Sequence, residues 1–377
     1  MKSLINTLFT MIVLFTFSAK AQVIQCDPWQ GWQVFKKHFV TQEGRVIDLG
    51  SEQSITTSEG QSYALFFALV ANDKAAFDNI LDWTQEHLSE GDLSTRLPAW
   101  KWGINKDNNK GGILDSNPAS DSDLWIAYSL SQAAILWNER RYSVLAAVLA
   151  KRIIREETAY IDGLGLSLLP APIGFEYDNK RYKLNPSYSP LFIYQQFKKL
   201  YPNSPWHELH ESSAKLLLNT ANKGVSPDWV MFDSNRGFYY DKKNTDLGSY
   251  NAIRVYLWAS MLAQDAPYKK ELLAQFDPFI ETINERGHVP LNTYAKSGKS
   301  EKRGPLGFNA ALLPLLAEKG NDSFVIAIQQ KLMVDKSFTK SRYYDSVLNL
   351  FAESTLNKRF KITADGTLKP MWSTECH

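Results

Sequence analysis

The chain has 377 residues, of which 44% are hydrophobic, 13% aromatic and 22% charged. This is enough apolar material for one large core or two modest ones, and it excludes a disordered chain, a collagen-like chain and a membrane protein with several spans. The 42 basic and 40 acidic residues nearly cancel, and Lys and Arg form no long block. We therefore expect no nucleic-acid partner and no anionic-membrane partner, and a neutral substrate fits better.

Residues 1–21 have the pattern of a secretory signal peptide. Lys2 supplies the positive end, residues 4–17 form the apolar stretch, and Ala19-Lys20-Ala21 is a small-x-small cleavage site. An uncleaved anchor helix is the alternative, but the apolar stretch is short for a hydrocarbon core of about 30 Å. We expect a periplasmic or secreted protein with no membrane insertion after cleavage, whose mature part is residues 22–377.

The two cysteines, Cys26 and Cys376, stand near the two ends of the mature chain. Export to an oxidising compartment would allow them to form a disulfide, and closing so long a loop stabilises by at most about 4 to 5 kcal/mol. Two free thiols are the alternative. Neither cysteine has the spacing of a metal or redox motif, and His207 and His210 lack the Glu of a zinc-binding helix, so we expect no metal and no cofactor.

Apolar periodicity and capping residues predict twelve helices in chain order. The first is expected to begin at Asp27, with Pro28 at its first helical position. The others are expected near 57–72, 74–89, 120–137, 139–157, 189–200, 205–221, 249–263, 268–286, 307–318, 321–333 and 341–355. Strands are expected only within 158–186, 229–240 and 359–372, and residues 105–117 are expected to form a polar loop.

The pattern indicates an all-α fold, and no Pro/Gly/Ser-rich linker divides residues 22–377, so one domain is expected. Twelve helices suit either an α-solenoid or a closed double ring. A solenoid repeats at a fixed period, and no such period is evident. The ring is therefore favoured, and joined termini would support it.

Two of the predicted helices begin with acidic side chains and continue with apolar ones on nearly every side. Ser58 and Gln61 match a capping box, which places Glu59 in the first turn. In the helix that begins at Ser120, Asp121 and Asp123 both fall in the first turn. Acids at these positions often only complement the helix dipole. A helix apolar all round is buried, however, so these acids are expected in a cleft or at the edge of the core.

A third helix begins at residues 249–251, with Arg254 and Trp258 on the same side as Asn251. Such a polar stripe is usually a solvated face. Three buried helices with polar N-terminal ends nevertheless indicate a common groove across one rim of a helical ring. Trp100 and Trp102 lie in the neighbouring loop 98–103, and we expect Trp102 to offer its face to a sugar ring in that groove.

Four motifs stand in order along the chain, at residues 56–63 (TTSEGQSY), 119–127 (ASDSDLWIA), 185–188 (NPSY) and 249–255 (SYNAIRV). They resemble glycoside hydrolase family 8, in particular the periplasmic endoglucanases encoded with bacterial cellulose synthases. The likeness runs from about Trp29 to Trp372. It implies an (α/α)6 barrel with a few short β-strands in the long loops, hydrolysis of β-1,4-glucan with inversion, and association with a cellulose synthase complex.

Inversion requires two carboxyl groups roughly 6.5 to 9.5 Å apart, one to protonate the leaving oxygen and one to activate water on the opposite face of the sugar. By the resemblance, Glu59 is the general acid and Asp121 grips the sugar at the cleavage subsite, with Asp123 supporting it. The resemblance also places Tyr188 and Arg254 at that subsite. Tyr250, in the fourth motif, is expected to bind substrate.

Asn251 departs from the family pattern, because endoglucanases of this type carry Asp there as the general base. An amide cannot take a proton from water, and loss of a base costs about 10² to 10⁴ in rate. Asp246 is the first candidate for a displaced base; Asp241, Asp228 and Asp121 are the others. The sequence thus favours an exported endo-β-1,4-glucanase with a displaced base over a catalytically impaired protein that binds glucan and guides cellulose during secretion.

Overall fold

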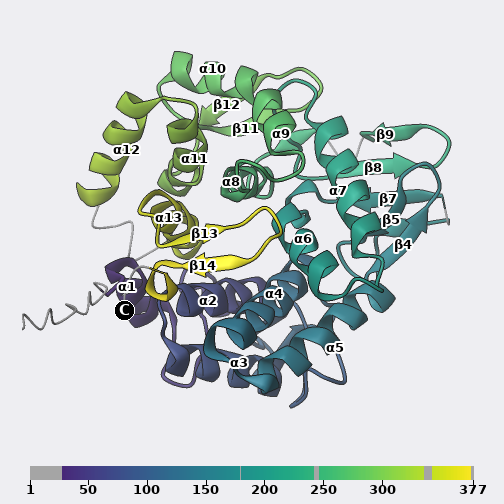
Figure 1. The fold of residues 1–377 in the computed structure, drawn as a ribbon, viewed down its shortest axis with the longest axis vertical. Helices are drawn as coiled ribbons and strands as arrows, with labels where there is room; N and C mark the ends of the chain where they lie inside the picture. Colours follow the sequence, from purple (N-terminus) through teal and green to yellow (C-terminus); the bar gives the residue numbers. More distant parts are fainter. Residues whose placement is uncertain (1–27, 179, 242–245, 335–341, 375–377) are drawn as a thin grey trace, which may run out of the picture.

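The computed structural model describes residues 28–178, 180–241, 246–334 and 342–374 (Figure 1). The predicted signal peptide, Cys26 and Cys376 lie outside these residues. Thirteen α-helices occur in the described part of the chain, together with short strands in the loops that join them. The helices form two concentric rings around one hydrophobic core, so the all-α (α/α)6 prediction is confirmed.

Six helices form the inner ring and lie parallel to one another. They are α2 (Ser58–Val70), α4 (Ser120–Trp137), α6 (Leu191–Leu200), α8 (Ala252–Met261), α11 (Leu306–Glu318) and α13 (Tyr343–Leu356). The outer positions are filled by α1 (Gln30–Phe39), α3 (Lys74–Leu88), α5 (Arg140–Glu156), α7 (Trp206–Thr220), the pair α9 (Lys269–Gln275) and α10 (Asp277–Arg286), and α12 (Asp322–Val334).

The rings form because inner and outer helices have different apolar patterns. Inner helices such as α2 and α8 are buried along almost their whole length, as expected of sequences that are apolar on every side. Outer helices such as α5 bury one face only. Each inner helix packs against the outer helix next to it in sequence, and α13 packs against α1, so that the end of the chain closes the ring on its beginning.

Aromatic side chains fill the axis of the barrel. Trp125 of α4 lies with its ring centroid 5.6 Å from that of Tyr63, 5.0 Å from Trp258 and 5.3 Å from Phe351. Trp258, expected to share a face with Asn251, therefore lies in this core, and its Nε1 donates to the carbonyl of Ser187 at 3.1 Å. The polar stripe on α8 faces the barrel axis and is not a solvated face.

The strands form small antiparallel sheets in the loops. One sheet joins β1 (Thr56–Thr57), β2 (Lys101–Ile104) and β3 (Gly111–Asp115), and β4 (Thr158–Ile161) pairs with β5 (Gly165–Leu168). Another sheet joins β6 (Glu176–Tyr177), β7 (Arg181–Leu184), β8 (Val230–Asp233) and β9 (Gly237–Tyr239). A second three-stranded sheet joins β10 (Leu247–Gly248), β11 (Pro290–Tyr294) and β12 (Ser300–Arg303), and β13 (Phe360–Ile362) pairs with β14 (Leu368–Pro370).

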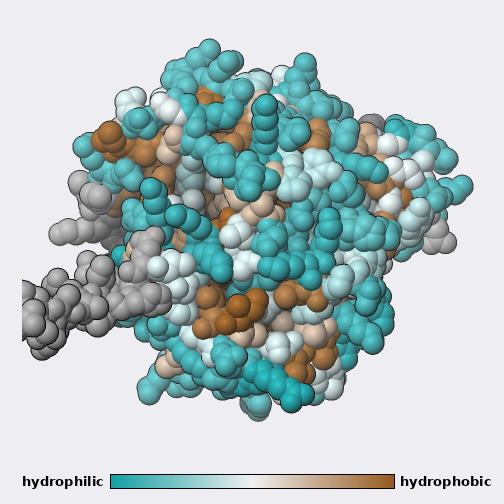
Figure 2. Space-filling model, viewed as in Figure 1, coloured by the Kyte–Doolittle hydropathy of each residue, from teal (hydrophilic) through white to brown (hydrophobic). Residues whose placement is uncertain are grey.

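The β13–β14 hairpin crosses the face of the barrel shown in Figure 1. Its Leu368 N–H donates to Gln132 Oε1 at 2.8 Å, and Trp372 Nε1 beyond it donates to the carbonyl of Leu69 at 3.0 Å. These contacts lie in the C-terminal halves of α2 and α4. Most of this face is hydrophilic, with hydrophobic side chains gathered below the hairpin (Figure 2). The hairpin thus covers the end of the barrel opposite to the N-terminal ends of α2 and α4.

Three predicted elements differ in the structure. The first helix begins at Gln30 instead of at Pro28, with Trp29 at its N-cap position. The single helix expected over 268–286 is two, α9 and α10, because Pro278 starts a new helix in its first turn. Strands also occur in segments where none was expected: β1, β2, β3, β10, β11 and β12, of which β3 lies within the predicted loop 105–117. Their pairing joins segments that no local pattern connects.

Within the described residues, no helix is long and apolar enough to cross a membrane. The long loops on the side of the inner-helix N-termini include the sheets β1–β2–β3 and β10–β11–β12, which hold the chain at the starts of α2 and α8. The fold therefore gathers the first turns of the inner helices at one rim.

Candidate active site

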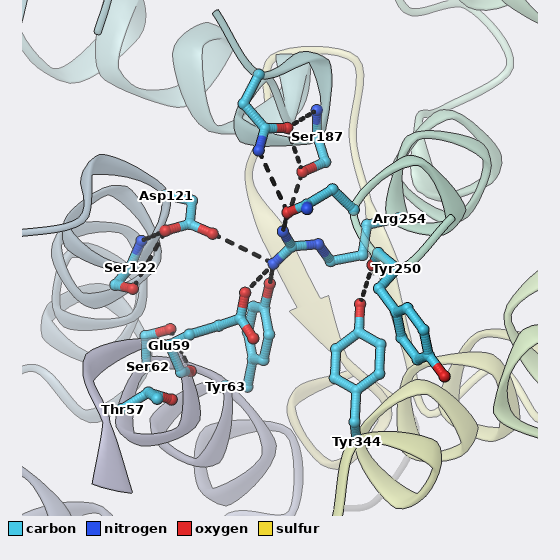
Figure 3. A network of polar contacts seen from close by, with 12 residues as sticks. Thr57, Glu59, Ser62, Tyr63, Asp121, Ser122, Ser187, Tyr250, Arg254 and Tyr344 are labelled. Atoms are coloured by element: carbon cyan, nitrogen blue, oxygen red, sulfur yellow. Dashed lines mark hydrogen bonds and ion pairs between the residues drawn. The ribbon is translucent and has the colours of Figure 1, made fainter. Parts of the chain in front are cut away.

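The rim brings together the three helix starts that the sequence singled out. Glu59 lies in the first turn of α2, Asp121 lies in the first turn of α4, and Asn251 is the residue before α8. The inner helices run parallel, and Glu59, Asp121 and Arg254 point toward one another from their first turns (Figure 3). Side chains that are far apart in sequence therefore meet at one place.

Arg254 of α8 is the centre of this meeting point. Its Nη1 donates to Glu59 Oε2, to Asp121 Oδ2 at 3.2 Å and to the hydroxyl of Tyr63 at 3.1 Å. Its Nη2 donates to Asn251 Oδ1 at 2.8 Å and to Ser187 Oγ at 3.0 Å. One planar guanidinium thus separates two carboxyl groups on one side from neutral polar groups on the other.

The start of α2 is fixed by contacts one residue away from those expected. Thr57, and not Ser58, is the N-cap: its Oγ1 accepts from the N–H of Gly60 at 3.0 Å. Gln61 makes no capping box. Its Oε1 accepts from Val46 N at 2.6 Å and its Nε2 donates to Thr84 Oγ1 at 2.9 Å, which ties the helix to the loop before it and to α3. Glu59 stays in the first turn, one-quarter exposed.

Gly60 follows Glu59 because there is no room for a larger residue. A Cβ at this position would lie 2.4 Å from the hydroxyl oxygen of Tyr343. Tyr343 therefore packs directly against the backbone beside Glu59, and α13 helps to hold the first turn of α2 in place. This contact explains a poor helix former in the first turn of a buried helix.

Asp121 is almost completely buried, with 3% of its surface exposed. Its Oδ1 accepts from the N–H of Ser122 at 2.8 Å and from Ser122 Oγ at 3.2 Å, and its Oδ2 faces Arg254. Burial raises the pKa of Asp121 to about 7, while the bonds from Ser122 oppose this rise. Both oxygens are thus held, on the same side of Arg254 as Glu59.

Asp123 lies behind Asp121 and faces Glu157, which follows α5. Both side chains are fully buried, and among the described residues none of their four carboxyl oxygens meets a hydrogen-bond donor. Burial, and then the charge of Asp123, raise the pKa of Glu157 well above its usual range; burial likewise raises the pKa of Asp123. Two carboxyl groups without a cation must hold a proton between them, since two buried, unpaired charges would be too costly.

Asn251 uses its only acceptor oxygen within the protein. Oδ1 accepts from Arg254 Nη2 and, at 3.2 Å, from Asn185 Nδ2. Directly beneath it lies Asp228, whose Oδ1 accepts from the backbone N–H groups of Ser249, Asn251 and Ala252 at 2.8, 3.0 and 2.7 Å. Asp228 therefore caps α8 in place of the residue at the N-cap position.

Aromatic side chains lie on both sides of Arg254. The ring centroid of Tyr188 lies 5.8 Å from the guanidinium carbon of Arg254, and the ring centroids of Tyr188 and Trp229 are 6.3 Å apart. On the other side, Tyr250 is 53% exposed, and its carbonyl accepts from the hydroxyl of Tyr344 at 2.7 Å. Tyr188 and Tyr250 were named from the sequence, whereas Tyr344 and Trp229 were not.

Trp102 lies beside the start of α2 but is packed against protein. Its strand β2 pairs with β1, opposite Thr56, and the Arg45 guanidinium lies 4.1 Å from its ring centroid. Trp83 contacts it edge-on at 5.6 Å. Trp100 is nearer to the helix start, because its carbonyl accepts from the N–H of Ser58 at 3.0 Å.

Asp246, the first candidate for a displaced base, contacts the loop between β11 and β12. Its Oδ2 accepts from the N–H of Lys296 at 2.9 Å, and its carbonyl accepts from Ala295 N. Among the described residues, it has no hydrogen bond to Arg254 or to Asn251. The geometry favours Asp228, which touches the backbone of Asn251 itself.

Four residues of the site were not assigned a role from the sequence: Ser187, Glu157, Trp229 and Tyr344. Ser187 stands inside the third motif, so the motif itself was a usable signal. Tyr344 lies in the first turn of α13, as Glu59 does in α2. Glu157 follows an amphipathic outer helix, and no local pattern marks it.

The comparisons with known proteins agree with one another. Residues 1–358 match the family model "Glycosyl hydrolases family 8". The chain is 44% identical to an endoglucanase of Escherichia coli O157:H7, covering 100% of this chain and 99% of that protein, and 36% identical to an endoglucanase of Pseudomonas fluorescens, covering 97% and 96%. It is also similar to the crystal structure of an endo-1,4-D-glucanase from Vibrio fischeri, with a TM-score of 0.87, 45% identity, and coverage of 91% and 99%. With its barrel, its carboxyl groups around Arg254 and these relatives, the chain belongs to glycosyl hydrolase family 8.

Proposed function

We propose that this chain is an endo-β-1,4-glucanase that cleaves internal bonds of a glucan with inversion. The observation that carries the proposal is the guanidinium of Arg254, which holds Glu59 and Asp121 on one side and Asn251 on the other. The full-length relatives at 44% identity are named endoglucanases, which supports the same activity.

Glu59 is the general acid of this proposal. It is the more exposed of the two carboxyl groups on Arg254, with one-quarter of its side chain accessible against 4% for Asp121. Only an accessible group can reach the glycosidic oxygen. Asp121 and Arg254 hold the hydroxyl groups of the sugar at the cleavage subsite, and the buried Asp123 lies behind them in the first turn of α4.

The aromatic residues define the path of the glucan. Tyr188, Trp229 and Phe175 follow one another away from Arg254, and the rings of Phe175 and Trp229 are stacked at 5.8 Å with an interplanar angle of 13°. Tyr250 stands on the opposite side. Flat rings of this kind pack against the apolar faces of sugars. Aromatic rings on both sides of Arg254 suit a glucan that continues in both directions from the cleavage point.

The cellular setting of the proposal comes from the N-terminal segment and the family resemblance. A cleaved signal peptide over residues 1–21 would deliver the protein to the periplasm or the medium. There it would meet β-1,4-glucan as it leaves a cellulose synthase complex. Retention of the purified protein by that complex, compared with nascent glucan alone, is the measurement that checks this association.

The activity is tested by the release of reducing sugar from soluble carboxymethylcellulose. We expect Glu59→Gln to lower kcat by 10² to 10⁴, because general acid catalysis contributes about that much. Inversion predicts that the first product, followed by NMR, is the α-anomer.

The second candidate, a glucan-binding protein with impaired catalysis, is favoured by one observation: the acceptor oxygen of Asn251 is fully used by Arg254 and Asn185. If wild type is no more active than Glu59→Gln while Asn251→Asp gains activity, that second candidate holds. A wild-type activity that Glu59→Gln abolishes supports the hydrolase.

A further inference from the structure

We propose that Asp228 is the general base that replaces the missing carboxylate at position 251. This inference rests on the proposed hydrolysis and names the residue that completes it. Asp228 is the carboxyl group in contact with the backbone of Asn251, 3.0 Å from its N–H. The side chain of Asn251 accepts from Arg254 Nη2, whereas Glu59 accepts from Nη1 of the same guanidinium.

The other candidates have their oxygens occupied or lie elsewhere. Both oxygens of Asp121 are held, and it shares Arg254 Nη1 with Glu59, whereas an inverting base must approach from the opposite face of the sugar. Asp246 binds the β11–β12 loop. Asp241 is exposed, and its negative charge acts on Lys183 of β7, where it opposes the lowering of the pKa of Lys183 by burial. Asp228 accepts hydrogen bonds from the backbone N–H groups at the start of α8.

The two oxygens of Asp228 have different surroundings. Oδ1 accepts three backbone N–H groups at the start of α8, which fixes the position of the carboxyl group. Oδ2 accepts no hydrogen bond from any residue that the structure describes. The side chain is partly exposed, and the next residue is Trp229 of the proposed glucan path. One oxygen is therefore anchored and the other is free to take a proton.

The charged and titratable groups around Asp228 favour a base at neutral pH. Burial raises its pKa above the ordinary value, although the three N–H groups oppose this rise. The hydroxyls that face it are those of Tyr256 on α8 and Tyr344 on α13, and burial raises the pKa of both, that of Tyr344 to about 12. Both stay neutral, so Asp228 keeps its negative charge and a basicity higher than that of an exposed carboxylate.

The step balances without a further reactant. A water molecule on the Asn251 side attacks the anomeric carbon, and one of its protons passes to Asp228 Oδ2. The bond from that carbon to the leaving oxygen breaks, and Glu59 gives its proton to this oxygen. The products are a sugar with an inverted anomeric hydroxyl and a sugar with a free 4-hydroxyl. Exchange with solvent returns the proton to Glu59 and removes it from Asp228.

The decisive variant is Asp228→Asn, because its amide oxygen can still accept the N–H groups of α8 while it no longer takes a proton. We expect kcat on carboxymethylcellulose to fall by 10² to 10⁴ with an unchanged thermal midpoint. Wild-type activity should fall on the acid side as Asp228 is protonated, and this acid limb should vanish from the residual activity of the variant. Asn251→Asp added to Asp228→Asn should restore at least tenfold.

Two comparison variants sharpen the test. Asp246→Asn removes the competing candidate and should keep wild-type kcat. Asp233→Asn is a matched control, because Asp233 also accepts a backbone N–H, from Asn235 at 2.9 Å in the β8–β9 turn. Asp228→Asn with activity within threefold of wild type, or with a loss that Asn251→Asp does not restore, overturns the inference alone. Wild type as inactive as Glu59→Gln overturns the proposed function and the inference with it.

Discussion

The two sides of Arg254 solve the same problem, how to hold polar groups at the edge of an apolar core, in opposite ways. On the acid side, Glu59 and Asp121 share Nη1, and Asp123 and Glu157 stand behind them. On the other side, which we call the base side after the proposed role of Asp228, Nη2 meets an amide and a hydroxyl, and Asp228 is held by backbone N–H groups. On the acid side, two carboxyl groups bind one cation and two more share a proton. On the base side, the contacts are hydrogen bonds from neutral groups and from the backbone.

Replacement of the shared guanidinium tests both sides at once and should have the largest effect. Arg254→Lys keeps the positive charge, but an ammonium cannot reach Glu59, Asp121, Asn251 and Ser187 together. Breaking a buried pair costs about 3 to 5 kcal/mol, and we expect the free energy of unfolding in urea to fall by about 3 kcal/mol. Hydrolysis of carboxymethylcellulose should fall at least 100-fold.

The matched control for this change is Arg152→Lys on α5. Arg152 also pairs with a carboxylate, Glu156, at 2.7 Å, and donates to the carbonyl of Ser94, but it lies on the outer ring. A partly exposed pair of this kind contributes about 0 to 1 kcal/mol. If Arg254→Lys and Arg152→Lys lose equal stability, Arg254 does not hold the two sides together.

The pair of Asp123 and Glu157 gives the acid side its own dependence on pH. Both pKa values are raised in the folded protein. The folded state therefore keeps protons that the unfolded state releases above about pH 4, and the stability from this pair is full below that pH and is lost as pH rises through the folded pKa values. The free energy of unfolding should therefore fall with pH between pH 4 and 8. We expect Glu157→Gln to reduce this slope by up to about 1.4 kcal/mol per pH unit, which corresponds to one proton, in urea unfolding.

Glu156→Gln is the control, because it makes the same change one residue earlier and keeps both buried carboxyl groups, while it removes a charge that raises the pKa of Asp123 and of Glu157. Its slope should change less than that of Glu157→Gln. An unchanged slope in Glu157→Gln would mean that the two carboxyl groups do not share a proton, and that the acid side resembles the base side more closely than the contacts indicate.

The parts of the molecule that follow from local pattern were predictable from the sequence. Apolar residues on every side predicted the inner helices, and first-turn acids placed Glu59 and Asp121 at a common rim. Contacts between distant segments were not predictable. Thr57 caps α2 in place of Ser58, and the side chain of Gln61 bonds Val46 from the loop before the helix. The break between α9 and α10 had a local signal, Pro278, whose weight was missed.

The site was predictable only where a motif carried it. Asp228 was one of four candidates and stood behind Asp246, since nothing in the residues near it indicates that its carboxyl group meets the start of α8. Glu157 gained its meaning from Asp123, 34 positions earlier, once α4 and α5 were packed together. On the acid side, the sequence therefore identified the residues that a motif contains, and it missed Glu157, whose role depends on a contact between distant segments.

The smallest expected effect is on the base side. Tyr344→Phe removes the hydroxyl that donates to the carbonyl of Tyr250, and a hydrogen bond of this kind contributes about 0.5 to 1.5 kcal/mol. Because Tyr250 precedes Asn251, the loss should loosen the start of α8 and raise KM by about two- to tenfold with little change in kcat. Tyr128→Phe is the control: its hydroxyl also donates to a carbonyl, that of Gly366 at 2.9 Å, in the opposite half of the barrel. If both variants lose the same stability and only Tyr344→Phe changes KM, neutral hydrogen bonds position the base side. If the two variants have the same KM, the base side keeps its position without this hydrogen bond.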